Sequence, residues 1–344
     1  MIVESLFSTI DRGKSGMNIG VSTGLPKLDN ITYGIQSCWM TVIGGDSGSG
    51  KSSLCLYTAV YRPYMQYLLT GRKLNINWLL FSFELSSEVI FAKLLSIYIY
   101  EVYNRVISYG DILSFNQTIS DEDYLLVCKS RPWLEELEAH CTIIDKPVTA
   151  NALYAITKEW TKQFGVYEKV DEYSENYIQK NEKQLLIVTV DHLGLIETSN
   201  NNTKKQEMDK ACDELIYFRN KCRLTIYIVQ QLNRNFKSMS RRTEGSGQYA
   251  GIQLDDFSDT SGATNAAEIV ISIFHPFREK MSEVNKYKIK NGLGDRARIL
   301  TVLKHRFGQS DVSDGVAFYG EVGIWKELPP PNEIDDYEIY KNLN

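Results

Sequence analysis

The sequence predicts an α/β fold in which helices cover both faces of a mostly parallel central sheet. Three observations carry this prediction. Short apolar runs alternate with longer helical patterns along most of the 344 residues, as in successive βαβ units. The strand runs are almost continuously apolar, which is typical of strands buried on both faces. Polar residues directly follow several of these runs, where the carboxyl ends of parallel strands gather ligand-binding groups.

The expected elements can be placed along the chain from these patterns. Strands are expected at residues 40–43, 77–83, 142–144, 185–190, 224–229, 267–274, 299–304 and 316–319. Helices are expected at 2–10, at 51–69 with a break or kink at Pro63, at 86–103 capped by Ser86, twice within 111–140 with the second at 132–139, at 149–164 capped by Thr149, and at 206–222. A turn and short helix at 22–35, a surface insertion at 168–184 and a long loop at 233–265 complete the chain.

This order of elements indicates one large domain at 23–328 with two short attachments. Residues 1–22 form a lead-in whose helix is too short to be stable alone, so it must pack on its own domain or on a neighbouring subunit. Residues 329–344 follow three consecutive prolines and carry four acidic residues, and we expect this tail to be disordered.

Composition excludes several classes of protein. The net charge of −5 is not the global footprint of a nucleic-acid binder, although it leaves room for a local basic channel. The six cysteines lack paired spacing, which argues for free thiols and against a zinc site. We find no signal peptide and no membrane span, so we expect a cytoplasmic protein without membrane contact.

A phosphate-binding loop follows the first strand. Gly45, Gly50, Lys51 and Ser52 fit the pattern G-x-x-x-x-G-K-[ST] between an expected strand and helix. The glycines allow successive N–H groups to point at phosphate oxygens, and the helix N-terminus adds a positive dipole end. Lys51 would hold the β- and γ-phosphates, and Ser52 would bind Mg²⁺. The nucleotide-binding candidates are Gly45, Asp46, Ser47, Gly48, Ser49, Gly50, Lys51, Ser52 and Ser53.

Three polar residues at the ends of later strands are candidates for the same site. Asp191 follows a buried strand and can hold Mg²⁺ together with Ser52, although aspartate is also common in strand-end turns. Glu84 can activate the attacking water or merely cap the next helix. Gln231 can contact the γ-phosphate or be an ordinary turn residue.

Lys304 and Arg306 occupy alternate positions, which places both on one face of a strand end. They could be a solvated basic edge. Alternatively, they could stabilise charge at the γ-phosphate of a neighbouring subunit, as an arginine finger does.

Seven segments in order make the chain similar to the ATPase domain of DnaB-type hexameric replicative helicases and their phage relatives. The resemblance covers most of residues 22–328. The matching segments are Ser22-Thr23-Gly24 with Leu28-Asp29 and Gly34, the loop from Gly45 to Ser52, Ser82-Phe83-Glu84-Leu85-Ser86, Val190-Asp191-His192-Leu193, Gln230-Gln231-Leu232-Asn233-Arg234, Ser261-Gly262-Ala263 with Ala267-Glu268-Ile269, and Lys304-His305-Arg306-Phe307-Gly308.

The resemblance implies a RecA-like P-loop NTPase core that uses ATP and Mg²⁺ as a DNA helicase. It assigns Glu84 as the catalytic glutamate, Gln231 as the γ-phosphate sensor, and Lys304 and Arg306 as finger residues in trans. It further implies a hexameric ring around single-stranded DNA, translocation from 5′ to 3′, and a bacterial or phage-infected cell. The acidic tail could contact replisome proteins. We expect residues 1–22 to stand in place of the family's linker helix, without the family's N-terminal domain.

The chain departs from the family pattern at the expected DNA loop. Asp259 stands where the family often has a basic residue, close to Asp255 and Asp256, and carboxylates repel a phosphate backbone. His192 replaces a usual tyrosine without a consequence for the metal. The remaining candidates for DNA contact, some of which could be simply solvated charges, are Lys204, Lys205, Arg234, Lys237, Arg241, Arg242, Ser261 and Gly262.

Two further hypotheses remain beside the helicase. A helicase-derived ATPase could act on a protein partner as a loader, recombination mediator or regulator, which the acidic loop and low net charge favour. A recombinase shares the same core but should form filaments rather than closed rings. Single-stranded DNA binding that weakens steeply with salt would separate the helicase from the ATPase that acts on a protein partner.

Overall fold

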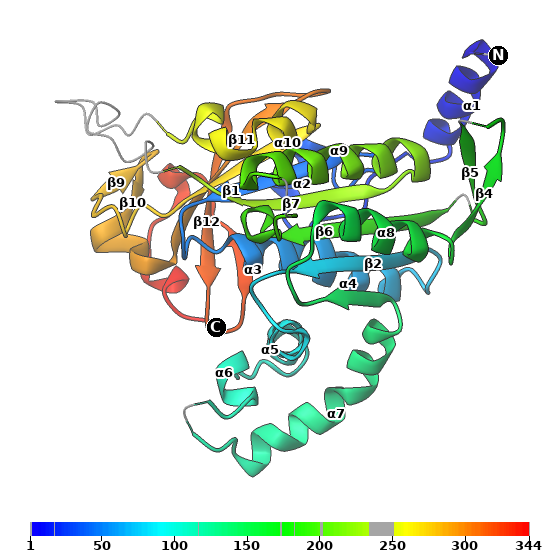
Figure 1. The fold of residues 1–344 in the computed structure, drawn as a ribbon. Helices are drawn as coiled ribbons and strands as arrows, with labels where there is room; N and C mark the ends of the chain where they lie inside the picture. The colour runs from blue at the N-terminus through cyan, green and yellow to red at the C-terminus, as the bar shows by residue number, and fades with distance from the viewer. Residues whose placement is uncertain are drawn as a thin grey trace.

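The computed structural model describes residues 2–343 except 17, 116, 173, 182, 200–201 and 234–250. A nine-stranded sheet crosses the molecule (Figure 1). In spatial order its strands are β13 (Ile324–Glu327), β12 (Val312–Tyr319), β11 (Ala297–His305), β8 (Ile269–Phe274), β1 (Met40–Gly45), β7 (Thr225–Gln231), β6 (Gln184–Asp191), β2 (Asn75–Ser82) and β3 (Cys141–Ile144). The strands from β8 to β3 are parallel, whereas β11, β12 and β13 are joined by antiparallel pairings.

Helices cover both faces of this sheet, which confirms the predicted fold class (Figure 1). One layer contains α3 (Lys51–Cys55), α4 (Arg62–Leu69) and α5 (Ser87–Tyr103), and the other contains α8 (Ala150–Thr161), α9 (Lys204–Cys222) and α10 (Ser261–Ala266). A further helix, α2 (Pro26–Thr32), precedes β1. Thr149 caps α8 as expected, because its hydroxyl accepts a hydrogen bond from Ala152 N.

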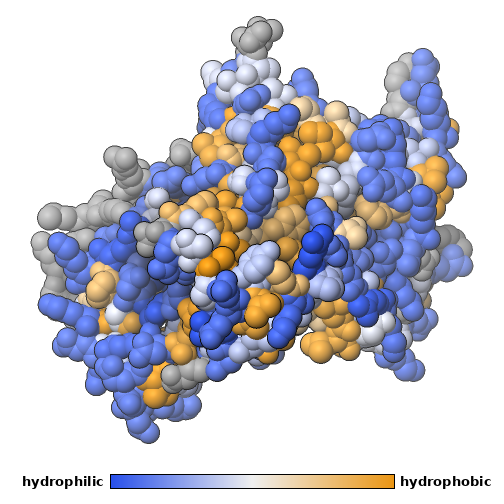
Figure 2. Space-filling view, turned by 90° about the horizontal axis from the view of Figure 1, so that it is seen from below, coloured by the Kyte–Doolittle hydropathy of each residue, from blue (hydrophilic) through white to orange (hydrophobic). Residues whose placement is uncertain are grey.

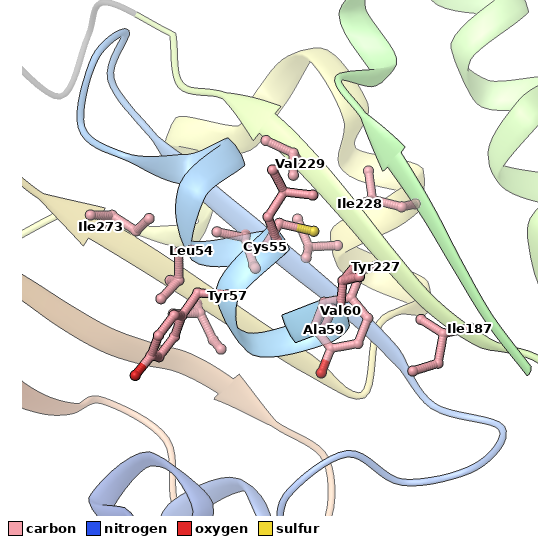
Figure 3. Close-up of a cluster of buried hydrophobic side chains, with 14 of the residues drawn as sticks. Leu54, Cys55, Tyr57, Ala59, Val60, Ile187, Tyr227, Ile228, Val229 and Ile273 are labelled. Carbon is pink, nitrogen blue, oxygen red and sulfur yellow. The ribbon is translucent and has the colours of Figure 1, made fainter. Parts of the chain in front are cut away.

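The core lies on both faces of the sheet, and one part of it is formed where the first helical layer meets the centre of the sheet. Figure 3 shows Leu54, Cys55 and Val60, just after the phosphate-binding loop, packed beside Val229 of β7 and other apolar residues of the sheet. All four are buried. The phosphate-binding loop therefore connects two elements that the core holds rigidly.

The helix after that loop continues through Pro63, so the predicted break is wrong. A π-helical segment (Leu56–Tyr61) leads directly into α4, with Pro63 in its first turn. Proline has no N–H to donate to the carbonyl four residues earlier. That carbonyl, of Ala59, accepts a hydrogen bond of 2.7 Å from Trp78 Nε1 instead.

Three other expectations differ from the structure. Pro132 lies inside one helix, α7 (Asp121–Glu138), and α6 (Tyr109–Ile112) precedes it. The expected insertion at 168–184 overlaps a hairpin of β4 (Gly165–Lys169) and β5 (Glu175–Gln179), whose mostly polar residues hide its strand character. Within the expected loop at 233–265, the described residues from 254 to 266 form a 3₁₀ segment (Leu254–Thr260) and α10.

Two apolar surfaces stand out from the compact core. The first helix, α1 (Ile2–Lys14), projects from the domain, and Ile2, Val3, Leu6, Phe7 and Ile10 on it are each at least half exposed (Figure 1). Hydrophobic residues also appear on the face seen in Figure 2, on the side of α5, α6 and α7. Exposed apolar surface of this kind often marks an interface. No helix in the described part of the chain is long and apolar enough to cross a membrane.

The acidic tail packs on the domain, contrary to the expected disorder. It forms two short 3₁₀ turns, Pro331–Glu333 and Glu338–Tyr340. Ile334 and Tyr337 are buried, and the Tyr337 hydroxyl accepts a hydrogen bond from Lys288 N. These two side chains find partners far away in sequence, which the local acidic composition does not reveal.

Replacing Tyr337 with alanine should therefore destabilise the whole domain. We expect a loss of about 2–4 kcal/mol in the free energy of unfolding, because a buried aromatic side chain is removed. Urea unfolding followed by circular dichroism measures this loss. The matched control is Asp335→Ala, an exposed residue of the same segment. Equal stability of both variants would mean that the tail does not pack.

Candidate active site

The phosphate-binding loop lies between the end of β1 and the start of α3. Gly50 has φ of +105°, a conformation that side-chain-bearing residues rarely adopt. A Cβ atom on Gly45 would lie 2.4 Å from Ser49 Oγ, so glycine is required there as well. The predicted residues from Gly45 to Ser53 thus form a tight turn that leads into a helix N-terminus, the geometry that receives phosphate.

Lys51 lies at the mouth of this turn. Its Nζ donates a hydrogen bond of 2.8 Å to the carbonyl oxygen of Asp46. Burial lowers the pKa of the Lys51 ammonium group, and the carboxylates of Asp191, Asp46 and Glu84 oppose this effect. The ammonium group is thus held by groups of the loop itself, close to where a phosphate would bind.

Asp191 and Ser52 form a donor set that fits Mg²⁺. Burial raises the pKa of the Asp191 carboxyl to about 6, while a hydrogen bond with Ser52 lowers it and the charge of Glu84 raises it further. Asp191 Oδ1 is buried and has no hydrogen-bond partner among the residues that the structure describes. An unpaired buried carboxylate oxygen beside a hydroxyl is what a hard cation requires.

Glu84 and Gln231 lie at the same edge of the sheet. Ser82 pairs with Asp191 in register, and Phe83 N donates to Asp191 O at 2.7 Å, which brings the exposed Glu84 to the edge beside Asp191. Gln231 pairs in register with Gly45. The structure thus brings four separate segments of the predicted site together.

Lys304 and Arg306 do not join this group within the same chain. Strand β11 runs antiparallel to β8, so His305 pairs with Ile269, which also pairs with Thr41 near the start of β1. The phosphate-binding loop begins four residues further along β1, about 13 Å away at 3.3 Å per residue. The two predicted finger residues therefore lie toward the opposite edge of the sheet.

The predicted DNA-binding residues have mixed outcomes. Arg234, Lys237, Arg241 and Arg242 lie outside the described residues. Ser261 and Gly262 open α10 instead of lying in a loop. Lys204 has a structural contact, since its Nζ donates to the carbonyl oxygen of Ile196.

The sequence reasoning missed two arginines that contact the loop. Arg278 follows the carboxyl end of β8 and donates to the carbonyl oxygen of Ser47. Arg298 is buried in β11 and donates to the carbonyl oxygen of Ser49 at 2.8 Å, and burial lowers its pKa to about 10. Arg298 could have been recognised from the sequence, because it is a charged residue inside an otherwise apolar strand.

Comparisons with known proteins agree with this architecture. The family model described as DnaB-like helicase C terminal domain matches residues 20–323. No curated protein sequence matches the chain. Among solved structures, one described as an ATPase domain superposes with a TM-score of 0.71 at 17% identity, covering 96% of this chain and 99% of that one.

A DnaB-like replicative helicase, solved in a study of its interactions with primase, gives a TM-score of 0.67 at 18% identity. It covers 95% of this chain, which spans 66% of that longer one. At such identities the superpositions show the RecA-like fold alone, whereas the family model matches most of the chain. The predicted resemblance is confirmed, and the chain belongs to the family of DnaB-like helicase C-terminal domains.

Proposed function

We propose that this chain is an ATP-dependent DNA helicase that works as a ring, with each ATP hydrolysed between two subunits. One observation carries the proposal: the phosphate-binding loop and the Lys304–Arg306 pair lie toward opposite edges of the same sheet. A single chain thus presents two half-sites that face away from each other. Joining such halves head to tail generates a ring when the rotation closes.

Each half-site has a distinct part in hydrolysis. The loop N–H groups and Lys51 bind the phosphates, while Ser52 and Asp191 hold Mg²⁺. When bound, the metal ion neutralises charge on the phosphate oxygens. Glu84 accepts a proton from the water that attacks the γ-phosphorus, and Gln231 binds the γ-phosphate from its place beside Gly45. Lys304 and Arg306 of the next subunit stabilise the charge that develops as ADP leaves.

The ring would grip single-stranded DNA by its backbone, without reading its sequence. Ser261 and Gly262 are our candidates for this contact, together with Arg234, Lys237, Arg241 and Arg242. Translocation from 5′ to 3′ follows the family pattern. The exposed acidic residues of the tail, Glu333, Asp335, Asp336 and Glu338, are candidates for contacts with other replication proteins.

A protein-directed ATPase is the competing function, and one structural fact weakens its motivation. Asp256 is buried, and its Oδ2 accepts a hydrogen bond of 2.8 Å from Gln253 N. This carboxylate has a structural role and adds little to the acidic surface of the segment. The acidic character that argues against DNA is therefore smaller than the sequence suggests.

Lys51→Ala and Arg306→Ala should each lower kcat by about 1,000-fold, as expected for the loss of a phosphate-binding lysine or a finger arginine. Random mixing of the two variants leaves roughly a quarter of the interfaces intact. We therefore expect the mixture to recover a comparable share of wild-type ATPase activity. A steady-state ATPase assay of each variant and of the mixture measures this. A mixture as inactive as its components would contradict a shared site.

Replacing both Leu6 and Phe7 with aspartate should break the ring, because we expect the exposed apolar face of α1 to pack on the next subunit. Size-exclusion chromatography with light scattering should show monomers that bind ATP but hydrolyse it slowly. Ser8→Asp, on the same helix, is the control and should leave the ring intact. Rings in the double variant would show that α1 does not hold subunits together.

Single-stranded DNA should stimulate the ATPase, and a forked duplex should be unwound. Because the contacts are mainly with phosphates, DNA affinity should fall about 10²-fold or more between 50 and 200 mM salt. Fluorescence anisotropy of labelled DNA measures the affinity. Absence of binding at low salt, together with normal basal ATPase, would favour the protein-directed alternative.

A further inference from the structure

Glu268 is a buried residue immediately before β8, and its carboxylate lies at the centre of an ionic network. It is 4% exposed. Its Oε2 accepts hydrogen bonds from Met40 N at 2.7 Å and from Arg219 Nη1 at 3.0 Å. Its Oε1 accepts from the same Arg219 atom at 3.0 Å and lies 3.1 Å from Arg306 Nη1. A buried carboxylate is stable only with such partners.

The two finger cations also contact the C-terminal end of α10. Lys304 Nζ donates to the carbonyl oxygens of Thr264 and Asn265 at 2.9 and 2.8 Å. Arg306 Nη2 lies 3.4 Å from the carbonyl oxygens of Asn265 and Ala266. The last carbonyls of a helix lack helical partners and form its negative end, so they attract cations.

These contacts orient Arg306 without burying it. Its side chain remains 43% exposed, in contrast to 6% for that of Glu268 and 10% for that of Arg219. Both terminal nitrogens of the guanidinium are therefore anchored, while the side chain as a whole remains accessible to solvent. Arginine in solution samples many rotamers, and an anchored finger avoids that entropic cost when it meets a phosphate.

We propose that Glu268 is the positioning residue of the finger, holding Arg306 in the orientation that reaches the nucleotide of the neighbouring subunit. This inference rests on the proposed function. The same carboxylate also accepts the hydrogen bond from the backbone N–H of Met40, which is the first residue of the strand that leads into the subunit's own phosphate-binding loop. Glu268 thus contacts both the strand that carries one nucleotide site and the finger that serves the next site.

The test is Glu268→Gln, which keeps the size of the side chain and removes its charge. We expect kcat to fall about tenfold or more, with an unchanged KM for ATP, because the variant still has an intact phosphate-binding loop. Mixing with Lys51→Ala subunits should restore activity, since those subunits supply a correctly held finger. Mixing with Arg306→Ala subunits should restore nothing, because both lack a working finger.

Glu207→Gln is the matched control. Glu207 is another buried glutamate, and it accepts hydrogen bonds from Ala150 N at 2.8 Å, at the start of α8, and from Asn202 Nδ2 at 2.8 Å, just before α9. Any loss in this variant should be one of stability and should not follow the mixing pattern above. Glu268→Asp keeps the charge on a shorter side chain, and we expect its kcat to lie between those of the wild type and Glu268→Gln. If Glu268→Gln fails to fold, Glu268→Asp still tests the inference, with an expected kcat below that of the wild type.

Three results would overturn the inference. The first is a wild-type kcat in Glu268→Gln. The second is a loss of kcat in Glu268→Gln that mixing with Lys51→Ala subunits does not restore, although the same subunits restore the activity of Arg306→Ala. That result would mean that Glu268 has a purely structural role. The third is a kcat in Glu268→Asp as low as in Glu268→Gln. Failure of Lys51→Ala and Arg306→Ala to restore each other would instead overturn the shared site, and this inference with it.

Discussion

The reversal of strand direction between β8 and β11 is the constraint on which the rest of the structure depends. Six parallel strands bring the loop after β1 and the ends of β2, β6 and β7 to one edge of the sheet. Because β11 runs the other way, its final residues emerge toward the opposite edge. Folding of one chain therefore separates the phosphate-binding loop from Lys304 and Arg306, and the shared site that we propose needs a second chain to bring them together.

Electrostatics follows this division. At the loop edge, Lys51, Arg278 and Arg298 all donate to loop carbonyls, which gathers three positive charges at the phosphate-binding loop. Burial raises the pKa of the Asp191 carboxyl, whose Oδ1 is buried without a hydrogen-bond partner among the described residues. At the opposite edge, Glu268 and the end of α10 balance the charges of Lys304 and Arg306. In the ring that we propose, each half-site would thus be ordered before it meets its partner.

Local signals allowed much of this to be predicted from the sequence. Glycine spacing located the phosphate-binding loop, and apolar runs located the strands that precede Glu84, Asp191 and Gln231. The errors arise where partners are distant in sequence. Continuation through Pro63 depends on Trp78, order in the tail depends on the core contacts of Tyr337, and the role of Arg298 depends on Ser49. The position of Lys304 and Arg306 depends on the direction of β11 in the sheet, which no short segment of the chain encodes.

Imaging of the assembly would reveal directly whether two chains share one nucleotide. Cryo-electron microscopy of the protein with a non-hydrolysable ATP analogue and single-stranded DNA would show which residues surround the γ-phosphate. We expect Lys51 and Ser52 of one subunit on one side of it and Arg306 of the neighbouring subunit on the other. A nucleotide enclosed by a single chain, with Arg306 far from every phosphate, would contradict this expectation.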